Sequence, residues 1–311
     1  MSKTNFDALL DAGVHFGHLR RKWNPAMAPY IFMERNGIHI IDLYKTMAKM
    51  DEAASALKQI AKSGKKILFV ATKKQAKEIV AEHVKRINMP YVTERWPGGM
   101  LTNFATIRKA VRKMISIDKL MSSPSYTNLS KKERLTITRE RAKLEKNLGS
   151  IADLNRLPSA IFIVDILKEH IALAEAKKLN IPTFAIVDTN SDPRMVDFPI
   201  PANDDASKSI SLILDYMVST IEEGLMERKL DRDKKAADDE RTEAEDLDYK
   251  MRSKMLEEIE EDEVDEDGIK IVKKDFVDTK VGKMKGMEPT EADKAKPARK
   301  RISKPAARTK K

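Results

Sequence analysis

Four aspartates in the second half of the chain have the chemistry to bind a metal ion. They lie in the turn Asp188–Pro193, which follows an apolar segment, and directly before the next helical pattern. Carboxylate oxygens are the ligands that Mg²⁺ prefers, and open α/β sheets hold ligands beyond the carboxyl ends of their strands. The same side chains also satisfy backbone groups in turns and at helix starts. We favour this structural role and assign no metal site and no catalytic role to Asp188, Asp192, Asp204 and Asp205.

Two closely spaced histidines, His15 and His18, lie in a glycine-marked segment. A zinc site needs a further ligand at suitable spacing, and no such residue is nearby in the sequence. A compact turn with buried imidazoles is therefore the preferred interpretation. The chain contains no cysteine, which excludes disulfides, thiolate metal sites and cysteine nucleophiles. We expect no cofactor and no enzymatic activity.

Two loops combine arginine with tryptophan, in Arg20–Asn24 and in Glu94–Gly99. Arginine can hold phosphate oxygens, and tryptophan can stack on an unpaired base, although a single tryptophan more often anchors a core. Two lysines also begin a helical pattern after a strand-like segment, where anions are favoured, but the glycines of a nucleotide-binding loop are missing. We predict RNA contacts from these three segments, through Arg20, Arg21, Lys22, Trp23, Lys73, Lys74, Arg95 and Trp96.

Short β-branched segments alternate with longer amphipathic segments through the first 225 residues. We predict strands at 38–41, 67–71, 91–92, 160–164 and 183–187, and helices at 43–62, 75–86, 168–179 and 205–223. Near-continuous apolar strands separated by helices are typical of a parallel sheet covered on both faces. Right-handed crossovers then give a doubly wound α/β sandwich domain, formed by residues 1–101 and 150–225.

The alternation is interrupted between Val92 and Ala160, where two helical patterns take the place of a strand. They span 102–121 and 130–148, and Ser130 with Glu133 forms a capping-box signature at the start of the second. We predict an inserted antiparallel coiled-coil hairpin over residues 102–149. The hairpin carries twelve basic residues and four acidic ones, so the predicted RNA-binding set also includes Arg108, Lys109, Arg112 and Lys113.

The distribution of charge points to a polyanionic partner. The chain has 311 residues, 59 of them basic and 49 acidic, with a net charge of +10. Residues 1–225 hold 35 basic and 25 acidic side chains (35 − 25 = +10), and such a surplus favours nucleic acid. No segment has the roughly 18 consecutive apolar residues that cross a bilayer, and the N-terminus carries no secretory signal. We therefore expect a cytoplasmic protein that contacts no membrane.

From residue 226 the composition becomes that of a charged tail. Residues 226–267 hold 9 basic and 19 acidic side chains (9 − 19 = −10), and residues 268–311 hold 15 basic and 5 acidic ones (15 − 5 = +10). Apolar residues are too sparse to offset the cost of ordering the chain, so we predict a largely disordered tail over 226–311, with a helical stretch around Leu230–Met255 where charges of both signs mix. One hypothesis is that the basic end binds RNA and that the acidic stretch competes with RNA for this basic end. A dispensable extension is the alternative.

Several strings of the folded region resemble the bacterial ribosomal protein S2 family. They are Ala12-Gly-Val-His-Phe-Gly-His18, Trp23-Asn-Pro25, Arg95-Trp-Pro-Gly-Gly-Met-Leu-Thr-Asn103, Ala185-Ile-Val-Asp-Thr-Asn-Ser-Asp-Pro193 and Pro201-Ala-Asn-Asp-Asp205. The resemblance extends from about residue 5 to residue 225. It leaves out the charged extension 226–311, and Pro97 stands where the family often has an apolar residue.

The resemblance implies a structural, non-catalytic constituent of the small ribosomal subunit. The family fold is a flavodoxin-like, doubly wound sheet of five parallel strands without flavin, and its coiled-coil domain is inserted where the hairpin is predicted here. The implied partners are small-subunit ribosomal RNA and neighbouring ribosomal proteins, including the large messenger-RNA-binding protein built of OB-fold repeats. The implied position is the solvent side near the head–body junction, and a homo-oligomer is not expected.

Two other functions remain as alternatives from the residues alone. A flavodoxin-like enzyme would use the turn Asp188–Asp192, but no nucleophile, histidine base or glycine-rich loop supports it. A histone-like compactor of nucleic acid would act through the tail. The basic surplus of residues 1–225, together with the strings above, favours the ribosomal interpretation.

Overall fold

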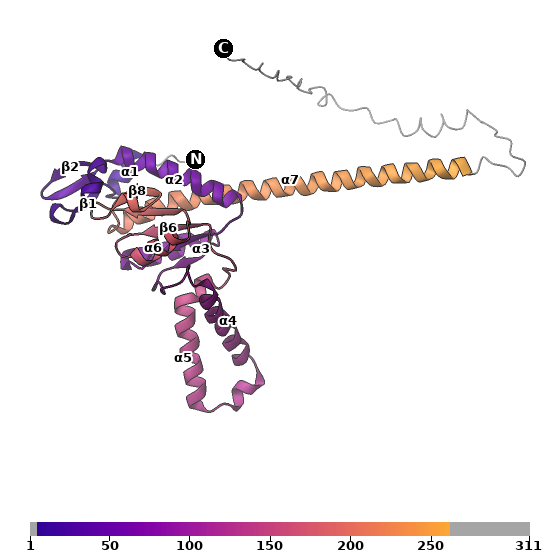
Figure 1. The fold of residues 1–311 in the computed structure, drawn as a ribbon, viewed down its shortest axis with the longest axis horizontal. Coiled ribbons are helices and arrows are strands. Elements are labelled where there is room, and N and C mark those ends of the chain that lie inside the picture. The colour runs from indigo at the N-terminus through magenta and orange to yellow at the C-terminus, as the bar shows by residue number, and fades with distance from the viewer. Residues whose placement is uncertain (1–4, 262–311) are drawn as a thin grey trace, which may run out of the picture. The chain divides into compact units, whose positions relative to one another are not determined.

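The computed structural model describes residues 5–261. The chain divides into two compact units, Met1–Ala236 and Ala237–Lys311. The first unit contains both sheets and the helical hairpin, and the second is described only as far as Glu261, where its helix ends (Figure 1). Within the described residues, no helix is both long enough and apolar enough to cross a bilayer.

The first unit is built on a parallel sheet of five strands (Figure 1). They are β4 (Ile67–Val70), β5 (Tyr91–Val92), β6 (Ala160–Val164), β7 (Thr183–Val187) and β8 (Phe198–Pro201), in the order β5-β4-β6-β7-β8. Numbered along the chain within this sheet, the order is 2-1-3-4-5, which is the flavodoxin-like arrangement. The predicted α/β class and the five-stranded parallel sheet are confirmed.

One predicted strand belongs to a different sheet. The strand at 38–41 is β3 (Ile38–Ile41), which pairs antiparallel with β1 (Phe16–Leu19) and β2 (Ile31–Arg35) in a small sheet. The fifth parallel strand is instead β8, which the sequence analysis missed because its four residues include two prolines. Proline lacks a backbone donor and is confined to edge strands, and β8 is an edge strand that pairs with β7 alone.

Helices cover both faces of the parallel sheet, as its apolar strands predict. They are α1 (Phe6–Asp11), α2 (Leu43–Lys62), α3 (Lys74–Arg86), α4 (Phe104–Met121), α5 (Lys131–Leu148), α6 (His170–Lys178) and α7 (Ser207–Glu261). On one face, α2, α3 and the start of α7 surround Phe69 and Phe162. On the other, α6 and parts of α4 and α5 surround Leu68 and Ile161. Consecutive strand residues point to opposite faces, so a sheet covered on both sides requires strands that are apolar throughout.

The inserted hairpin consists of α4 and α5, which lie side by side and are joined through the 3₁₀ helix η3 (Pro124–Asn128) (Figure 1). Buried side chains at Val111, Met114 and Ile117 form the apolar seam of α4. The predicted capping box is confirmed: the Ser130 hydroxyl accepts from the backbone N–H of Glu133, and the Glu133 carboxylate accepts from the backbone N–H of Ser130. The hairpin therefore has a defined start to its second helix.

The N-terminal segment is fixed over the carboxyl end of β7. Two 3₁₀ helices, η1 (Arg20–Lys22) and η2 (Pro25–Tyr30), connect β1 to β2. The backbone N–H of His18 donates to the Thr189 hydroxyl at 2.8 Å, and a Cβ on Gly17 would lie 2.6 Å from Thr189 Cγ2. Only glycine permits so close an approach. The small sheet is thereby attached to the edge where the parallel strands end.

The helix α7 begins in the first unit and continues into the second. The chain is therefore helical from residue 226 to Glu261, within the predicted tail, and this includes Leu230–Met255, where a helix is expected. Residues 262–311 lie outside the described residues. The disorder expected there and the RNA role expected of the basic end therefore stay predictions. The predicted start of the tail at 226 does not coincide with the end of the first unit at Ala236.

Candidate nucleic-acid interface

A buried glutamate holds the loop after β5 in one conformation. Glu175, on α6, accepts hydrogen bonds from the Trp96 indole N–H at 3.1 Å and from the backbone N–H groups of Gly99 at 2.7 Å, Leu101 at 2.9 Å and Thr102 at 3.1 Å. Burial alone would raise the pKa of Glu175. The hydrogen bonds from Thr102, Leu101, Trp96 and Gly99 outweigh burial, and the pKa lies below its ordinary value. The loop is therefore assembled around a charged carboxylate.

This arrangement separates two neighbours that the sequence analysis grouped together. Trp96 is buried, with 7% of its surface exposed, and its indole N–H is bound by Glu175. Arg95, the adjacent residue, is exposed. The loop thus presents the Arg95 guanidinium to solvent on a backbone that the buried tryptophan anchors.

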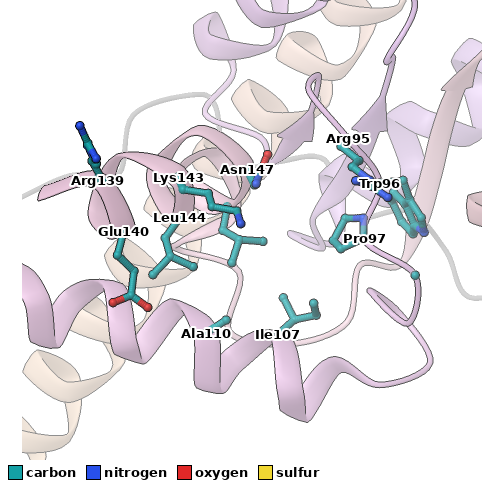
Figure 2. Close-up of a pocket in the computed structure, with 12 residues that line it drawn as sticks. Arg95, Trp96, Pro97, Ile107, Ala110, Arg139, Glu140, Lys143, Leu144 and Asn147 are labelled. Atoms are coloured by element: carbon teal, nitrogen blue, oxygen red, sulfur yellow. The ribbon is translucent and has the colours of Figure 1, made fainter. Parts of the chain in front are cut away.

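A groove of about 760 Å³ lies between this loop and the base of the hairpin (Figure 2). Its lining combines the apolar side chains of Ile107 and Leu144 with the cationic side chains of Arg95 and Lys143. Arg139, further along α5, points away from the groove (Figure 2). An apolar floor beside cationic groups suits the base and phosphate of a nucleotide.

The four predicted basic residues of α4 are not equally available. Lys109 and Arg112 are exposed. Arg108 is half-buried and donates to acceptors in residues 154–155, so it also fastens the hairpin to the sheet domain. Lys113 forms an ion pair with α5, but an exposed pair of this kind contributes little to stability and can exchange its partner. Of these four residues, Lys109 and Arg112 are therefore the most available for contact with a partner.

The predicted residues near the N-terminus form an exposed group. Arg20, Arg21 and Lys22 make up η1 and are exposed, and Arg20 pairs with Glu34 at 3.2 Å. The Trp23 side chain is 37% exposed, and its ring lies 5.2 Å from the ring of His39. Trp23 is the predicted tryptophan whose ring reaches solvent.

The two predicted lysines at the start of α3 have different surroundings. The Lys73 ammonium lies 2.8 Å from Asp204 Oδ1 and 2.6 Å from Asp205 Oδ1, and its side chain is only 12% exposed. Burial alone would lower the pKa of Lys73, but the hydrogen bonds to Asp204 and Asp205 raise it above its ordinary value. Lys73 is thus a counter-ion within the fold, while Lys74 is exposed.

The predicted residues consequently fall into two groups. Arg95 meets the base of the hairpin at the groove, and Lys109 and Arg112 lie on α4 of the same hairpin, outside the groove lining. The residues of η1, together with Lys73, belong to the carboxyl edge of the parallel sheet. Trp96 lines the groove from below the surface and positions Arg95.

Sequence reasoning missed two contacts that shape these surfaces. The first is the role of Glu175, although a single acid between Leu173 and Ala176 on a buried helix face is a signal, because a buried carboxylate needs donors. The second is the contact between His18 Nδ1 and Asp188 Oδ2 at 2.9 Å. These two residues are distant in sequence, and no local pattern predicts that they meet.

Similarity to known proteins covers the region that carries both groups. The family model described as Ribosomal protein S2 matches residues 9–224. The chain is 73% identical over 232 residues to the small ribosomal subunit protein uS2 of Phocaeicola vulgatus, which covers 75% of this chain and 83% of the relative. It is 71% identical over 232 residues to the protein of that name from Bacteroides thetaiotaomicron, with coverage of 75% and 84%. The corresponding protein of Christiangramia forsetii is 69% identical over 228 residues, with coverage of 73% and 76%.

Proposed function

Since the chain belongs to the ribosomal protein S2 family, it is a structural, non-enzymatic constituent of the small ribosomal subunit, and we propose which of its surfaces contact RNA there. Its partners are ribosomal RNA and neighbouring ribosomal proteins. The observation that carries the proposed RNA contact is the groove between the loop of Arg95 and the hairpin, where cationic and apolar side chains lie together. The alternatives of a flavodoxin-like enzyme and of a tail-driven compactor are set aside.

The groove and the hairpin form the first RNA-binding surface in this proposal. Arg95, Lys109, Arg112 and Lys143 are exposed cations that can reach phosphate oxygens. The apolar side chains of Ile107 and Leu144, which line the groove with Arg95 and Lys143, can receive an unpaired base or a ribose. Trp96 contributes by holding Arg95 in place.

The second RNA-binding surface is η1 with Trp23 and Lys74. The exposed Arg20, Arg21 and Lys22 supply phosphate contacts, and Trp23 supplies a stacking face. Lys73 supports this surface from within, because its ammonium is committed to aspartates.

Recognition through these surfaces depends on shape and backbone charge, since most of the contacts are made by cations. With six to ten phosphates contacted, affinity should fall by about 10³–10⁵-fold between 50 and 200 mM salt, by analogy with duplex DNA. Folded RNA is read mainly through its shape, its backbone and its exposed loops. A position on the solvent side near the head–body junction, and docking of the OB-fold-repeat protein, are proposed on the family resemblance alone.

Charge reversal at the first surface tests the proposal. The variant Arg95→Glu/Lys109→Glu/Arg112→Glu changes three exposed side chains that stabilise no described element. A filter-binding titration of the full chain on small-subunit ribosomal RNA should show weaker binding and a salt slope reduced by about three.

A control variant separates a local contact from the effect of net charge. Lys65→Glu/Lys177→Glu/Lys178→Glu makes the same change in charge at exposed positions outside both surfaces. It should keep the wild-type salt slope. Equal losses in the two variants would show that binding follows net charge and not the proposed surface.

A further inference from the structure

The part of α7 that belongs to the second unit is acidic and carries exposed apolar side chains. We call residues 237–261 the distal segment of α7. Its sequence holds 4 basic and 11 acidic residues, which gives a net charge of −7 (4 − 11 = −7). Leu247 is 61% exposed and Met251 is 72% exposed. These two residues are four positions apart, so they lie one turn apart on the same face of the helix.

The distal segment needs a partner to be stable as a helix. Its acidic residues far outnumber its basic ones, and like charges on neighbouring turns weaken a helix. Most helical stability in proteins comes from the packing of an apolar face. Among the described residues, the face of Leu247 and Met251 remains exposed. A partner for this face must therefore combine positive charge with apolar side chains.

The next segment of the same chain has this composition. Residues 268–285 hold 6 basic and 2 acidic residues (6 − 2 = +4). Residues 268–311 contain nine Val, Ile, Met and Phe residues, and seven of them fall within 268–285, among them Ile271, Val272 and Phe276. Residues 268–285 thus match the distal segment in both charge and apolar character, whereas residues 286–311 match it mainly in charge.

We propose that residues 268–285 fold back and bind the distal segment of α7 on the face of Leu247 and Met251. The lysines of residues 268–285 pair with the carboxylates of the helix, and the apolar side chains of these residues cover the exposed pair. Because only residues 262–267 connect the two partners, they meet at an effective concentration of about millimolar, and a weak contact is sufficient.

The length of the chain permits this contact. Leu247 lies 14 positions before Glu261 (261 − 247 = 14), which is about 21 Å along a helix that rises about 1.5 Å per residue. Residues 262–267 are enough for a turn, and an extended chain then covers about 21 Å in about six residues. The chain around residue 274 therefore reaches Leu247, and Val272 and Phe276 lie on either side of this point.

The contact serves an RNA-binding protein by shielding charge. RNA repels an exposed anionic helix, and residues 268–285, with their charge of +4, offset part of the −7 of the distal segment. The 6 cations of residues 268–285 are also withheld from RNA while the protein is free. This role does not depend on either of the RNA-binding surfaces proposed above.

Energy transfer within the full chain tests the proposal. The chain has no cysteine, so Lys235→Cys/Thr279→Cys provides two unique sites for a donor and an acceptor dye. Without the contact, about 39 Å of helix followed by a flexible coil separates the dyes by about 45 Å. A bound segment brings them within about 25 Å, whether it is extended or helical. Transfer should be strong at low salt and should fall in about 1 M salt, where the Debye length is about 3 Å.

Two variants each remove one half of the contact. Lys270→Glu/Lys273→Glu/Lys274→Glu reverses charge in residues 268–285. Leu247→Gln/Met251→Gln removes the apolar pair from α7 and replaces it with a good helix former. Each variant should lower the low-salt transfer to the high-salt value. The first variant leaves α7 untouched, so it decides the question if the second variant loses its helix.

Each variant has a matched control. Lys304→Glu/Arg308→Glu/Lys310→Glu makes the same change in charge outside residues 268–285, and Tyr249→Gln removes an exposed side chain from a different face of the helix. Both controls should keep the wild-type transfer. Low transfer in the wild type at low salt, or equal losses in the variants and their controls, would overturn the proposal. Transfer between mixed chains that carry one dye each would also overturn it, because the occupant would then be a second copy.

Discussion

The substitution Glu175→Gln removes the charge around which the loop after β5 is assembled. In the wild type, Glu175 Oε1 accepts from Trp96 and Gly99, and Oε2 accepts from Leu101 and Thr102. Glutamine has one acceptor oxygen, so in either orientation its amide group faces two N–H donors, one of which belongs to a buried residue, Trp96 or Leu101. An unsatisfied buried donor costs about 1–3 kcal/mol, and a loss of about that size in the free energy of unfolding is expected.

Urea denaturation of the full chain measures this loss, and hydrogen exchange shows where it acts. The amides of Gly99, Leu101 and Thr102 should exchange faster in Glu175→Gln, because their acceptor is weakened. Glu78→Gln, which changes an exposed glutamate on α3, is the matched control and should shift neither measurement. A loss below about 0.5 kcal/mol, within the range of ordinary surface substitutions, with unchanged exchange at the three amides, would refute the role given to Glu175.

Three further predictions concern pH, packing and the tail. Because the pKa of Glu175 is depressed, its stabilisation is present above the ordinary value of about 4.3 and is lost as the pH falls through the lower folded value; urea midpoints of wild type and Glu175→Gln should therefore converge in acid. Gly17→Ala places a Cβ 2.6 Å from Thr189 Cγ2 and should cost about 1–3 kcal/mol in urea denaturation, whereas Gly98→Ala, where no atom lies within 4 Å of the new Cβ and the backbone is not left-handed, should show no such loss. Deletion of residues 268–311 should weaken retention of ribosomal RNA at moderate salt in filter binding, and equal retention would mean that the basic end is dispensable.

Local patterns were sufficient to predict most of the elements. Apolar segments such as Ala160–Val164 and the capping box at Ser130 are recognisable from a few consecutive residues, and both are present. The strand Phe198–Pro201 escaped prediction because its prolines are tolerated only through its place at the sheet edge. The strand Ile38–Ile41 was predicted correctly, but local pattern does not say which sheet a strand joins.

The functional surfaces were harder to predict than the elements, because burial and pairing depend on the tertiary fold. Lys73 and Lys74 are adjacent and chemically identical, yet one is held by aspartates and the other is exposed. Trp23 and Trp96 occur in similar loops, yet only Trp23 keeps its ring at the surface. Residue type and spacing identified the segments, and the fold decided which side chain of each segment reaches solvent.

Sedimentation of the tagged full chain with ribosomal particles tests the central claim most directly. In a sucrose gradient of cell extract, the wild-type chain should sediment with the small subunit and remain there at moderate salt. Arg95→Glu/Lys109→Glu/Arg112→Glu should be depleted from that fraction, while Lys65→Glu/Lys177→Glu/Lys178→Glu should remain. A wild-type chain found only at the top of the gradient would contradict the assignment as a small-subunit protein, and full incorporation of the first variant would contradict the proposed RNA surface.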